Sequence, residues 1–310
     1  MKANYRTIGL MRLCRLLGIT RQSYYQHFWN KENIKVEHEL VLKEVINIRK
    51  HHRYMGGRKL YELLSLFLLE HQIKMGRDAF FDLLSSNYLL VRKKKRKVYT
   101  TQSFHWLKKY KNLIKGYCPT GINQLWVSDI TYWKNKNSYI YISFITDAYS
   151  HKVVGYNAAE TLEAIESVAA LEMALTSLIA TEGQLIHHSD RGIQYCSDQY
   201  IRLLKENRIQ ISMTETGDPL DNAIAERVNG IIKNEYLCDY KVENLLQAKE
   251  VLEFVVNLYN EERPHMSNGN LTPDLIHHNN LKAKKLWKNY QSNKLQPVNL
   301  LQDKENKVNS

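Results

Sequence analysis

Residues 124–133 read QLWVSDITYW, a run in which Asp129 stands among Trp, Val, Ile and Tyr side chains. A short run of this composition predicts a buried β-strand. Burying a carboxylate without a partner is energetically expensive, so a charged Asp129 needs compensation. A divalent cation that other carboxylates also hold would supply it, and the run therefore predicts a metal site with oxygen ligands.

The residues that follow predict alternating strands and helices. Residues 138–150 and 151–160 are rich in Tyr, Ile and Val, which favours two more strands joined by tight links. After them we expect helix 161–180 with Thr161 as its N-cap, strand 184–190, helix 197–209, strand 210–215 and helices 221–237 and 244–262. This order predicts an α/β fold with a mixed five-stranded sheet covered on both faces, as in a ribonuclease-H-like domain.

Two further acids lie at the ends of predicted elements. Asp190 ends strand 184–190, and Glu226 lies one turn into helix 221–237, which Asp221 can cap. Clusters of two or three carboxylates select hard cations such as Mg²⁺ or Mn²⁺ over zinc. The four cysteines are scattered without a CxxC pair, so neither a zinc site nor a disulfide framework is predicted.

The helix around Glu226 has one polar face. Asn222, Glu226, Asn229 and Lys233 recur at spacings of three and four residues, while Ile and Val take the other side. On this face Glu226 can bind a metal ion while Lys233 reaches a phosphate of the same substrate. We expect Asn222 to orient the substrate or to cap the helix.

The charge of the chain is unevenly distributed. Residues 1–119 hold 25 Lys and Arg against 8 Asp and Glu, a net charge of +17, whereas residues 120–310 hold 19 against 24, a net charge of −5. The basic half indicates a polyanion binder, because each neutralised phosphate releases counterions. The alternative is that Lys and Arg only solvate helix surfaces.

The basic half predicts helices. Residues 8–28 favour two short helices around Gly18, with Thr20 as the N-cap of the second, and this pattern is typical of a helix-turn-helix. Arg21 and Gln22 open the second helix and can reach base edges or phosphates. Further helices are expected at 38–50, at 55–71 after the Gly56-Gly57 break, and at 76–87 with Asn87 as its stop. The run Arg92, Lys93, Lys94, Lys95, Arg96, Lys97 is expected to be a solvated basic arm that binds DNA.

Several strings together resemble one protein family. LWVSDITYW, HHSDRGIQYCS and GDPLDNAIAERVNGIIKNE, followed by YNEERPH and LTPDLI, are similar to the second-frame transposase (OrfB) of a large family of bacterial insertion sequences with two overlapping reading frames. The strings RLCRLLGITRQSYY and IRKHHRYMGGRKL resemble the N-terminal helix-turn-helix segments of that family. The resemblance covers about residues 10–276. The 60 residues between Asp129 and Asp190, and the 35 between Asp190 and Glu226, also resemble the core of DDE transposases and retroviral integrases.

The resemblance implies a function and a set of site residues. Asp129, Asp190 and Glu226 match the family's metal ligands and catalytic residues, and Lys233 matches the basic residue seven positions after the family Glu. It implies a DNA transposase and integrase that cuts transposon ends and joins them to target DNA with two Mg²⁺ or Mn²⁺ ions. DNA, a second copy of the chain and an upstream-frame OrfA protein or fusion are the implied partners. The strings YMGGRKL and HMSNGN differ from those usual in the family. These differences concern the details of DNA contact and leave the implied chemistry unchanged.

The combined reading divides the chain into segments. They are a helix-turn-helix segment 1–35, a second helical DNA-binding segment 36–97 with the basic run, a linker 98–120, a ribonuclease-H-like integrase core 121–280 and a polar tail 281–310.

Other polar residues have weaker predictions. Asp147 is expected to serve a turn, and the His187-His188 pair is expected to support the site, with His188 nearer the metal ions. Arg263 and His265 are expected either to contact the DNA backbone or to lie in a surface turn. The pair at 277 and 278 is expected to be exposed to solvent.

The sequence excludes some functions and leaves others open. The chain has no GxxxxGK[ST] string, so ATP use is not predicted, and no apolar run or leader pattern predicts a membrane or secreted protein. A bacterial cytoplasmic, nucleoid-associated protein is expected. The alternatives are a DNA-binding regulator with an inactive core, and a ribonuclease-H-type nuclease that acts on RNA–DNA hybrids.

Overall fold

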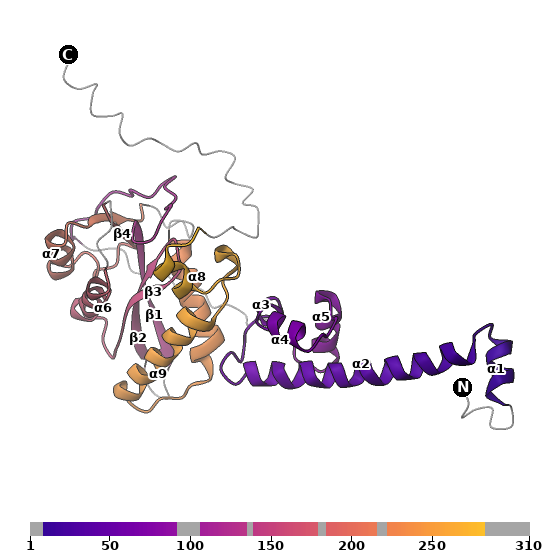
Figure 1. Cartoon of the computed structure of the whole chain (residues 1–310). Helices are drawn as coiled ribbons and strands as arrows, with labels where there is room; N and C mark the ends of the chain where they lie inside the picture. The colour runs from indigo at the N-terminus through magenta and orange to yellow at the C-terminus, as the bar shows by residue number, and fades with distance from the viewer. Residues whose placement is uncertain (1–8, 92–105, 135–138, 179–183, 216–221, 283–310) are drawn as a thin grey trace, which may run out of the picture. The chain divides into compact units, whose positions relative to one another are not determined.

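The computed structural model describes residues 9–91, 106–134, 139–178, 184–215 and 222–282, apart from the side chains of 28 and 30–33. The chain divides into two compact units, Met1–Arg92 and Lys93–Ser310. Each unit is described by itself, and Figure 1 shows the elements of both. None of the helices in these described ranges is both long and apolar enough to cross a membrane.

The N-terminal unit begins with a short helix, a turn and a long helix. α1 spans Leu10–Leu16, and Gly18 adopts a left-handed φ of 67° in the turn. Thr20 caps α2 as predicted, because its Oγ accepts the N–H of Ser23 at 3.0 Å. α2 is one continuous helix, Arg21–Ile48, and this corrects the prediction of separate helices at 21–28 and 38–50. No Gly or Pro interrupts residues 21–48, so nothing in the backbone ends the helix early.

Three shorter helices pack on the second half of α2. They are α3 (Gly57–Leu63), α4 (Ser65–Glu70) and α5 (Arg77–Ser86). Asn87 ends α5 as expected, since its side-chain N–H donates to the carbonyl of Leu83 at 2.8 Å. The core of this unit joins Val41 and Val45 of α2 to buried residues of the other helices, among them Leu60, Leu64, Phe80 and Leu84.

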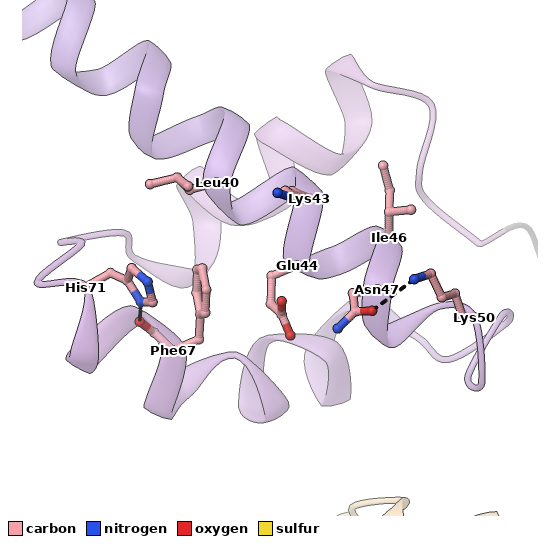
Figure 2. A pocket seen from close by; sticks show the side chains of 8 residues that line it. All are labelled: Leu40, Lys43, Glu44, Ile46, Asn47, Lys50, Phe67 and His71. Carbon is pink, nitrogen blue, oxygen red and sulfur yellow. Dashed lines mark hydrogen bonds between the residues drawn. The ribbon is translucent and has the colours of Figure 1, made fainter.

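A shallow groove runs between α2 and α4 in the N-terminal unit. Figure 2 shows Leu40, Ile46 and Phe67 in it, with His71 hydrogen-bonded to the carbonyl of Phe67. Polar side chains of α2 and of the residues just after it line the rest of the groove: Lys43, Glu44, Asn47 and Lys50. None of the three acids predicted at the metal site belongs to it.

The second unit contains the predicted mixed sheet. Its strands are β1 (Leu125–Lys134), β2 (Tyr139–Asp147), β3 (Val153–Ala159), β4 (Ile186–Ser189) and β5 (Gln210–Met213). The strand order is β3-β2-β1-β4-β5. The first three strands are antiparallel, whereas β1, β4 and β5 are parallel. This confirms the ribonuclease-H-like arrangement, with β1 at the centre of the sheet.

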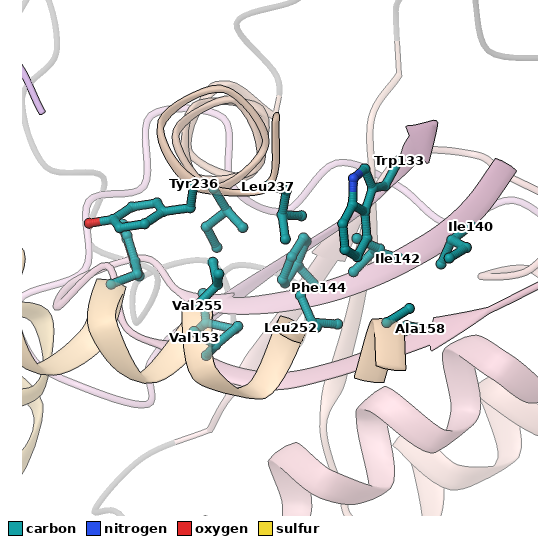
Figure 3. Packing of buried hydrophobic residues seen from close by; sticks show 14 of the residues in the cluster. Trp133, Ile140, Ile142, Phe144, Val153, Ala158, Tyr236, Leu237, Leu252 and Val255 are labelled. Atoms are coloured by element: carbon teal, nitrogen blue, oxygen red, sulfur yellow. The ribbon is translucent and has the colours of Figure 1, made fainter. Parts of the chain in front are cut away.

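Helices cover both faces of the sheet. α6 (Ala164–Thr176) and α7 (Asp198–Glu206) pack on one face in a cluster that contains Trp126. α8 (Ala223–Ile231) and α9 (Leu245–Asn257) cover the other face, which Figure 3 shows around Trp133 and Phe144. α10 (Pro273–Asn279) follows them.

Two helix boundaries differ from the predictions. Thr161 does not cap α6, whose N-cap position is Glu163. Glu163 has the extended backbone of an N-cap residue, so the helix starts two residues later than an N-cap at Thr161 would place it. α8 and α9 both end in a π-helical turn, Ile232–Tyr236 after α8 and Leu258–Glu262 after α9. Asp221, the expected cap of α8, lies outside the described residues.

The segment before β1 covers the edge strand β5. The carbonyl of Lys111 accepts the N–H of Met213 at 3.3 Å, and Ser212 Oγ accepts the N–H of Leu113 at 2.8 Å. Ile114 and Tyr117 then pack against the cluster that contains Ala225 at the start of α8. This part of the expected linker therefore belongs to the fold of the second unit.

Candidate active site

The C-terminal end of a parallel strand pair brings Asp129 and Asp190 together. β1 pairs with β4 from Leu125 to Val127, and Asp129 follows two residues later on the same strand. β4 ends at Ser189, so Asp190 comes directly after it. Neighbouring parallel strands end at the same edge of a sheet, and this edge is the usual position for a site in α/β folds.

α8 brings Glu226 to the same edge. Its first turn packs through Ala225 on Val127, and the side-chain N–H of Asn222 donates to the carbonyl of Ser128 at 2.9 Å. Two turns further on, Asn229 Nδ2 donates to Asp129 Oδ2 at 2.9 Å. Glu226 lies between these two anchoring residues on α8 and is therefore held beside β1.

The charges of Asp190 and Glu226 both act on the Asp129 carboxyl. Burial, together with the charges of Asp190 and then Glu226, raises the pKa of Asp129 from 3.8 to about 7. Hydrogen bonds from the Ile130 N–H and from Asn229 oppose this rise in pKa. Mutual repulsion of this kind is relieved when a cation binds between the carboxylates.

A tight turn fixes the Asp190 carboxylate. Asp190 Oδ1 accepts the N–H of Gly192 at 2.9 Å. A Cβ on Gly192 would lie 2.9 Å from that same oxygen, so only glycine leaves the carboxylate in place. The Gly in the DRG string therefore has a steric role in shaping the site.

A buried hydrogen-bond network supports the strands beneath the acids. His187 Nε2 hydrogen-bonds Ser128 Oγ at 2.7 Å and the Tyr200 hydroxyl at 2.9 Å. Burial, followed by the neighbouring His188, lowers the pKa of His187 to about 3, so the imidazole in this network is neutral. The network ties β4 to β1 at Ser128, the residue directly before Asp129.

Lys233 lies on the π-helical turn after α8. Its ammonium stands 3.7 Å from the centroid of the Tyr132 ring, and Tyr132 lies three residues after Asp129 on β1. Burial lowers the pKa of Lys233 below its usual 10.5. Lys233 therefore lies against the strand that carries Asp129, and its contact with DNA stays a prediction.

The other residues predicted near the site have structural partners. His188 Nδ1 hydrogen-bonds Ser212 Oγ at 2.8 Å in the buried part of β4. Asn222 occupies the N-cap position of α8, but its side chain bonds Ser128 instead of capping the helix. Asp147 accepts the N–H and the hydroxyl of Ser150 at 2.7 Å each, which confirms its role in a turn.

Two expectations about the C-terminal segment are wrong. Arg263 and His265 were expected at a surface turn or on the DNA backbone, yet Arg263 is 1% exposed and His265 is 4% exposed. Arg263 pairs with Glu235 inside the unit, which takes its guanidinium out of solvent. His277 was expected in solvent, but it is buried and lies 3.0 Å from Ser150 Oγ.

The predicted DNA-binding residues are only partly described. Arg21 and Gln22 are exposed in the first turn of α2, and the Arg21 guanidinium lies 5.7 Å from the Tyr25 ring centroid. The basic run 92–97 lies outside the described residues.

Sequence reasoning missed three residues of the site. Asn229 was placed on the polar face but given no role, and Ser128 and Tyr132 were read only as strand residues. The sequence did contain a signal for Asn229, because it lies three residues after Glu226 and so shares one face of α8 with that acid. No local pattern indicates the partners of Ser128 and Tyr132, which come from β4 and from the turn after α8.

The donor set fits a hard cation. Two Asp carboxylates and one Glu carboxylate supply only oxygen, and the Oδ1 atoms of Asn222 and Asn229 are buried without a hydrogen-bond partner. Such oxygen ligands suit Mg²⁺ or Mn²⁺. Among the residues that the structure describes, no three His, Cys, Asp or Glu side chains are already close enough to hold an ion. The carboxylates would therefore have to draw together around one.

Known proteins match most of the chain. The integrase core domain family matches residues 119–219, and a second family model of the same description matches residues 207–273. A 31 kDa protein of insertion element IS600 from Shigella sonnei, described as uncharacterized, is 34% identical over 84% of this chain and 96% of its own length. The transposase of insertion sequence element IS629 from Shigella sonnei is 29% identical over 82% of this chain and 86% of its own length. The chain belongs to the insertion-sequence transposases with an integrase core domain.

Other similarities of this transposase are more partial. Transposase InsF of IS3A from Escherichia coli K12 is 30% identical over 57% of this chain and 62% of its own length. The catalytic core domain of HTLV-2 integrase in complex with magnesium is 23% identical, covers 50% of this chain and 97% of that chain, and superposes with a TM-score of 0.41. A chain of the simian T-cell lymphotropic virus intasome in complex with PP2A regulatory subunit B56 gamma is 16% identical. The match covers 79% of this chain and 80% of that chain, with a TM-score of 0.45.

Proposed function

We propose that this chain is a DDE-type transposase that cuts DNA at the ends of its element and joins the freed 3′ ends to target DNA. One observation carries the proposal: the partly buried Asp129 lies at the end of the β1–β4 pair, with Asp190 and Glu226 both close enough to raise its pKa. A site of concentrated negative charge, with Lys233 packed on the strand that carries Asp129, suits phosphodiester chemistry in which cations neutralise the substrate.

Asp129, Asp190 and Glu226 would hold two Mg²⁺ or Mn²⁺ ions. When bound, such ions activate the attacking oxygen of water or of a 3′-hydroxyl and stabilise the leaving oxygen of the phosphodiester. No Ser or Tyr nucleophile is then required, because the reaction needs no covalent bond between protein and DNA.

The protein's own residues would position these groups. Asn229 holds Oδ2 of Asp129, which fixes the direction in which the other oxygen points. Gly192 keeps Asp190 in its turn, and Lys233 would neutralise a phosphate next to the scissile bond. Each role uses a side chain already held against β1 or the end of β4.

The basic N-terminal unit would supply DNA affinity. Arg21 and Gln22 at the exposed start of α2 would contact the ends of the element, and the run at 92–97 would follow the phosphate backbone. A second copy of the chain and an upstream-frame OrfA protein or fusion are the proposed protein partners, because two DNA ends must be brought to one target.

The test is a joining assay with purified protein. A supercoiled plasmid that carries the element's terminal repeats is incubated with Mg²⁺ or Mn²⁺, and nicked and joined products are separated on a gel. We expect cleavage at the 3′ ends and strand transfer, both lost in Asp190→Asn. Equal activity in Asp190→Asn would refute the proposal. Hydrolysis of RNA–DNA hybrids without joining of DNA ends would instead favour a ribonuclease-H-type nuclease.

A further inference from the structure

Two widened helical turns, one after α8 and one after α9, are linked by an ion pair. α8 continues into the π-helical turn Ile232–Tyr236, and α9 continues into the π-helical turn Leu258–Glu262. A π turn closes i→i+5 hydrogen bonds and is rare, and such turns occur often at functional sites. Lys233 and Glu235 both lie in the first turn, and Arg263 directly follows the second.

Glu235 and Arg263 join the two turns through a two-pronged ion pair. Arg263 Nε donates to Glu235 Oε2 at 2.9 Å, and Arg263 Nη2 donates to Glu235 Oε1 at 2.9 Å. The side chain of Arg263 is 1% exposed and that of Glu235 is 21% exposed. The Arg263 guanidinium also lies 5.8 Å from the Tyr259 ring centroid. The planar guanidinium fork fixes the orientation of Glu235 as well as its distance.

Stability alone is a poor explanation for this pair. Removing a guanidinium and a carboxylate from water costs as much as their attraction returns, and apolar side chains of similar size often serve a core equally well. A buried ion pair does specify one geometry, because any other packing leaves a charge buried without its partner. Here the pair specifies the geometry of the π turn Ile232–Tyr236, which carries Glu235.

The same π turn places the Lys233 side chain against β1. Residues two apart on a helical turn point to different sides, so Glu235 faces Arg263 while Lys233 faces Tyr132. The Lys233 ammonium lies 3.7 Å from the Tyr132 ring centroid, on the strand that carries Asp129. If Glu235 lost its partner, the turn could relax to a regular α-helix and move Lys233 off that ring.

We infer that Glu235 and Arg263 are a positioning pair that holds the π turn after α8, and so keeps the Lys233 ammonium against Tyr132 of β1, where it can meet a DNA phosphate. The part of this inference that concerns DNA rests on the proposed function. Neither residue needs to contact DNA for this role, which agrees with the burial of Arg263.

The first test measures the position of Lys233 without DNA. Wild type, Glu235→Gln and Arg263→Lys are treated briefly with an amine-acylating reagent, and acylation of Lys233 is measured by mass spectrometry relative to the exposed Lys205. We expect both variants to raise Lys233 acylation about threefold, the factor that a cation–π contact of modest strength is worth. Asp274→Asn, which breaks the Lys152–Asp274 pair of 2.7 Å in the same unit, is the matched control and should leave Lys233 unchanged.

The second test links that position to DNA. The affinity for a labelled duplex of the terminal repeat is measured for Glu235→Gln, Lys233→Ala and the double variant. We expect Glu235→Gln to weaken binding in the wild-type background and to have little further effect beside Lys233→Ala, whereas it lowers the melting temperature equally in both backgrounds.

The outcomes separate the two claims. If Glu235→Gln and Arg263→Lys lower the melting temperature but leave Lys233 acylation as in Asp274→Asn, the pair is only structural and the inference is overturned. If acylation rises while Lys233→Ala leaves DNA affinity unchanged, the positioning of Lys233 is upheld and its proposed DNA contact fails.

Discussion

Asn229 donates its side-chain N–H to Oδ2 of Asp129 across 2.9 Å, from the helix that carries Glu226 to the strand at the centre of the sheet. The contact joins two of the three elements that supply the acids. Asn229 is 4% exposed, so water does not compete for this bond. The position of one acid therefore depends directly on the helix that holds another.

Replacing Asn229 should damage the chemistry more than the fold. In Asn229→Ala the Asp129 carboxylate loses its orienting donor, and we expect the rate of strand transfer to fall about 10- to 100-fold, as is typical when a residue that orients a metal ligand is removed. The free energy of unfolding should fall by about 1–2 kcal/mol. Joining assays and urea unfolding measure the two effects.

Asn234→Ala is the matched control for Asn229→Ala. Asn234 lies on the turn after α8 with an exposed side chain, whose N–H donates to the carbonyl of Gly230 at 2.6 Å. We expect it to leave strand transfer within about twofold of wild type, since surface substitutions are usually mild. An equal loss of rate in both variants would show that the Asn229–Asp129 bond has no special role.

The raised pKa of Asp129 predicts that replacing this residue increases stability at neutral pH while it abolishes activity. Folding raises this pKa from 3.8 to about 7, so the folded protein favours the protonated carboxyl. The stability that this group contributes is complete below pH 4 and is lost as the pH rises through 7. Without divalent cations, Asp129→Asn should therefore be more stable than wild type at pH 8, by up to about 4 kcal/mol, and inactive.

Urea unfolding in EDTA at several pH values from 4 to 8 checks this prediction. The advantage of Asp129→Asn over wild type should grow between pH 4 and pH 7 and then level off. A constant difference across that range would mean that Asp129 titrates normally in the folded chain.

Several sequence predictions succeeded because they depend on local signals. The strand that contains Asp129, the capping of α2 by Thr20 and the end of α5 at Asn87 all follow from residue type and spacing. The meeting of Asp129 and Asp190 also follows, since a mixed sheet brings the ends of its parallel strands together.

The failures concern features that arise only on packing. Arg263 reads as a surface residue in the string NEERPH, and only the π turn after α9 and the carboxylate of Glu235 explain its burial. Separate helices were expected to end at 28 and to start at 38, but no Gly or Pro in between breaks the backbone of α2. Partners that lie far apart in sequence, such as Tyr132 and Lys233, leave no local pattern to read.

Cation binding should depend on pH through Asp129. Protons and Mg²⁺ compete for the same carboxylate oxygens, so Mg²⁺ affinity should rise with pH up to about 7 and then level off. Isothermal titration calorimetry at several pH values measures this, and the release of protons on binding should peak below pH 7. Asp129→Asn should bind Mg²⁺ weakly at every pH. A pH-independent affinity in the wild type would exclude Asp129 as a ligand.

Replacing Gly155 by alanine should mainly lower stability, whereas replacing Gly192 should mainly lower activity. A Cβ on Gly155 of β3 would lie 2.2 Å from the carbonyl of Ala170 on α6, so Gly155→Ala forces the helix off the sheet. We expect it to cost about 2–4 kcal/mol of unfolding free energy. A Cβ on Gly192 meets only side chains, Asp190 Oδ1 at 2.9 Å and Gln194 Oε1 at 3.1 Å, which can move aside at small cost in stability.

For Gly192→Ala the cost should appear in catalysis, because moving the Asp190 carboxylate misplaces one of the three acids. We expect strand transfer to fall at least about tenfold with a melting temperature close to that of wild type. Gly155→Ala, assayed at a temperature where it is folded, should keep most of its specific activity, since its clash lies between β3 and α6. If Gly192→Ala kept full activity, the turn after β4 would not hold Asp190 for the reaction.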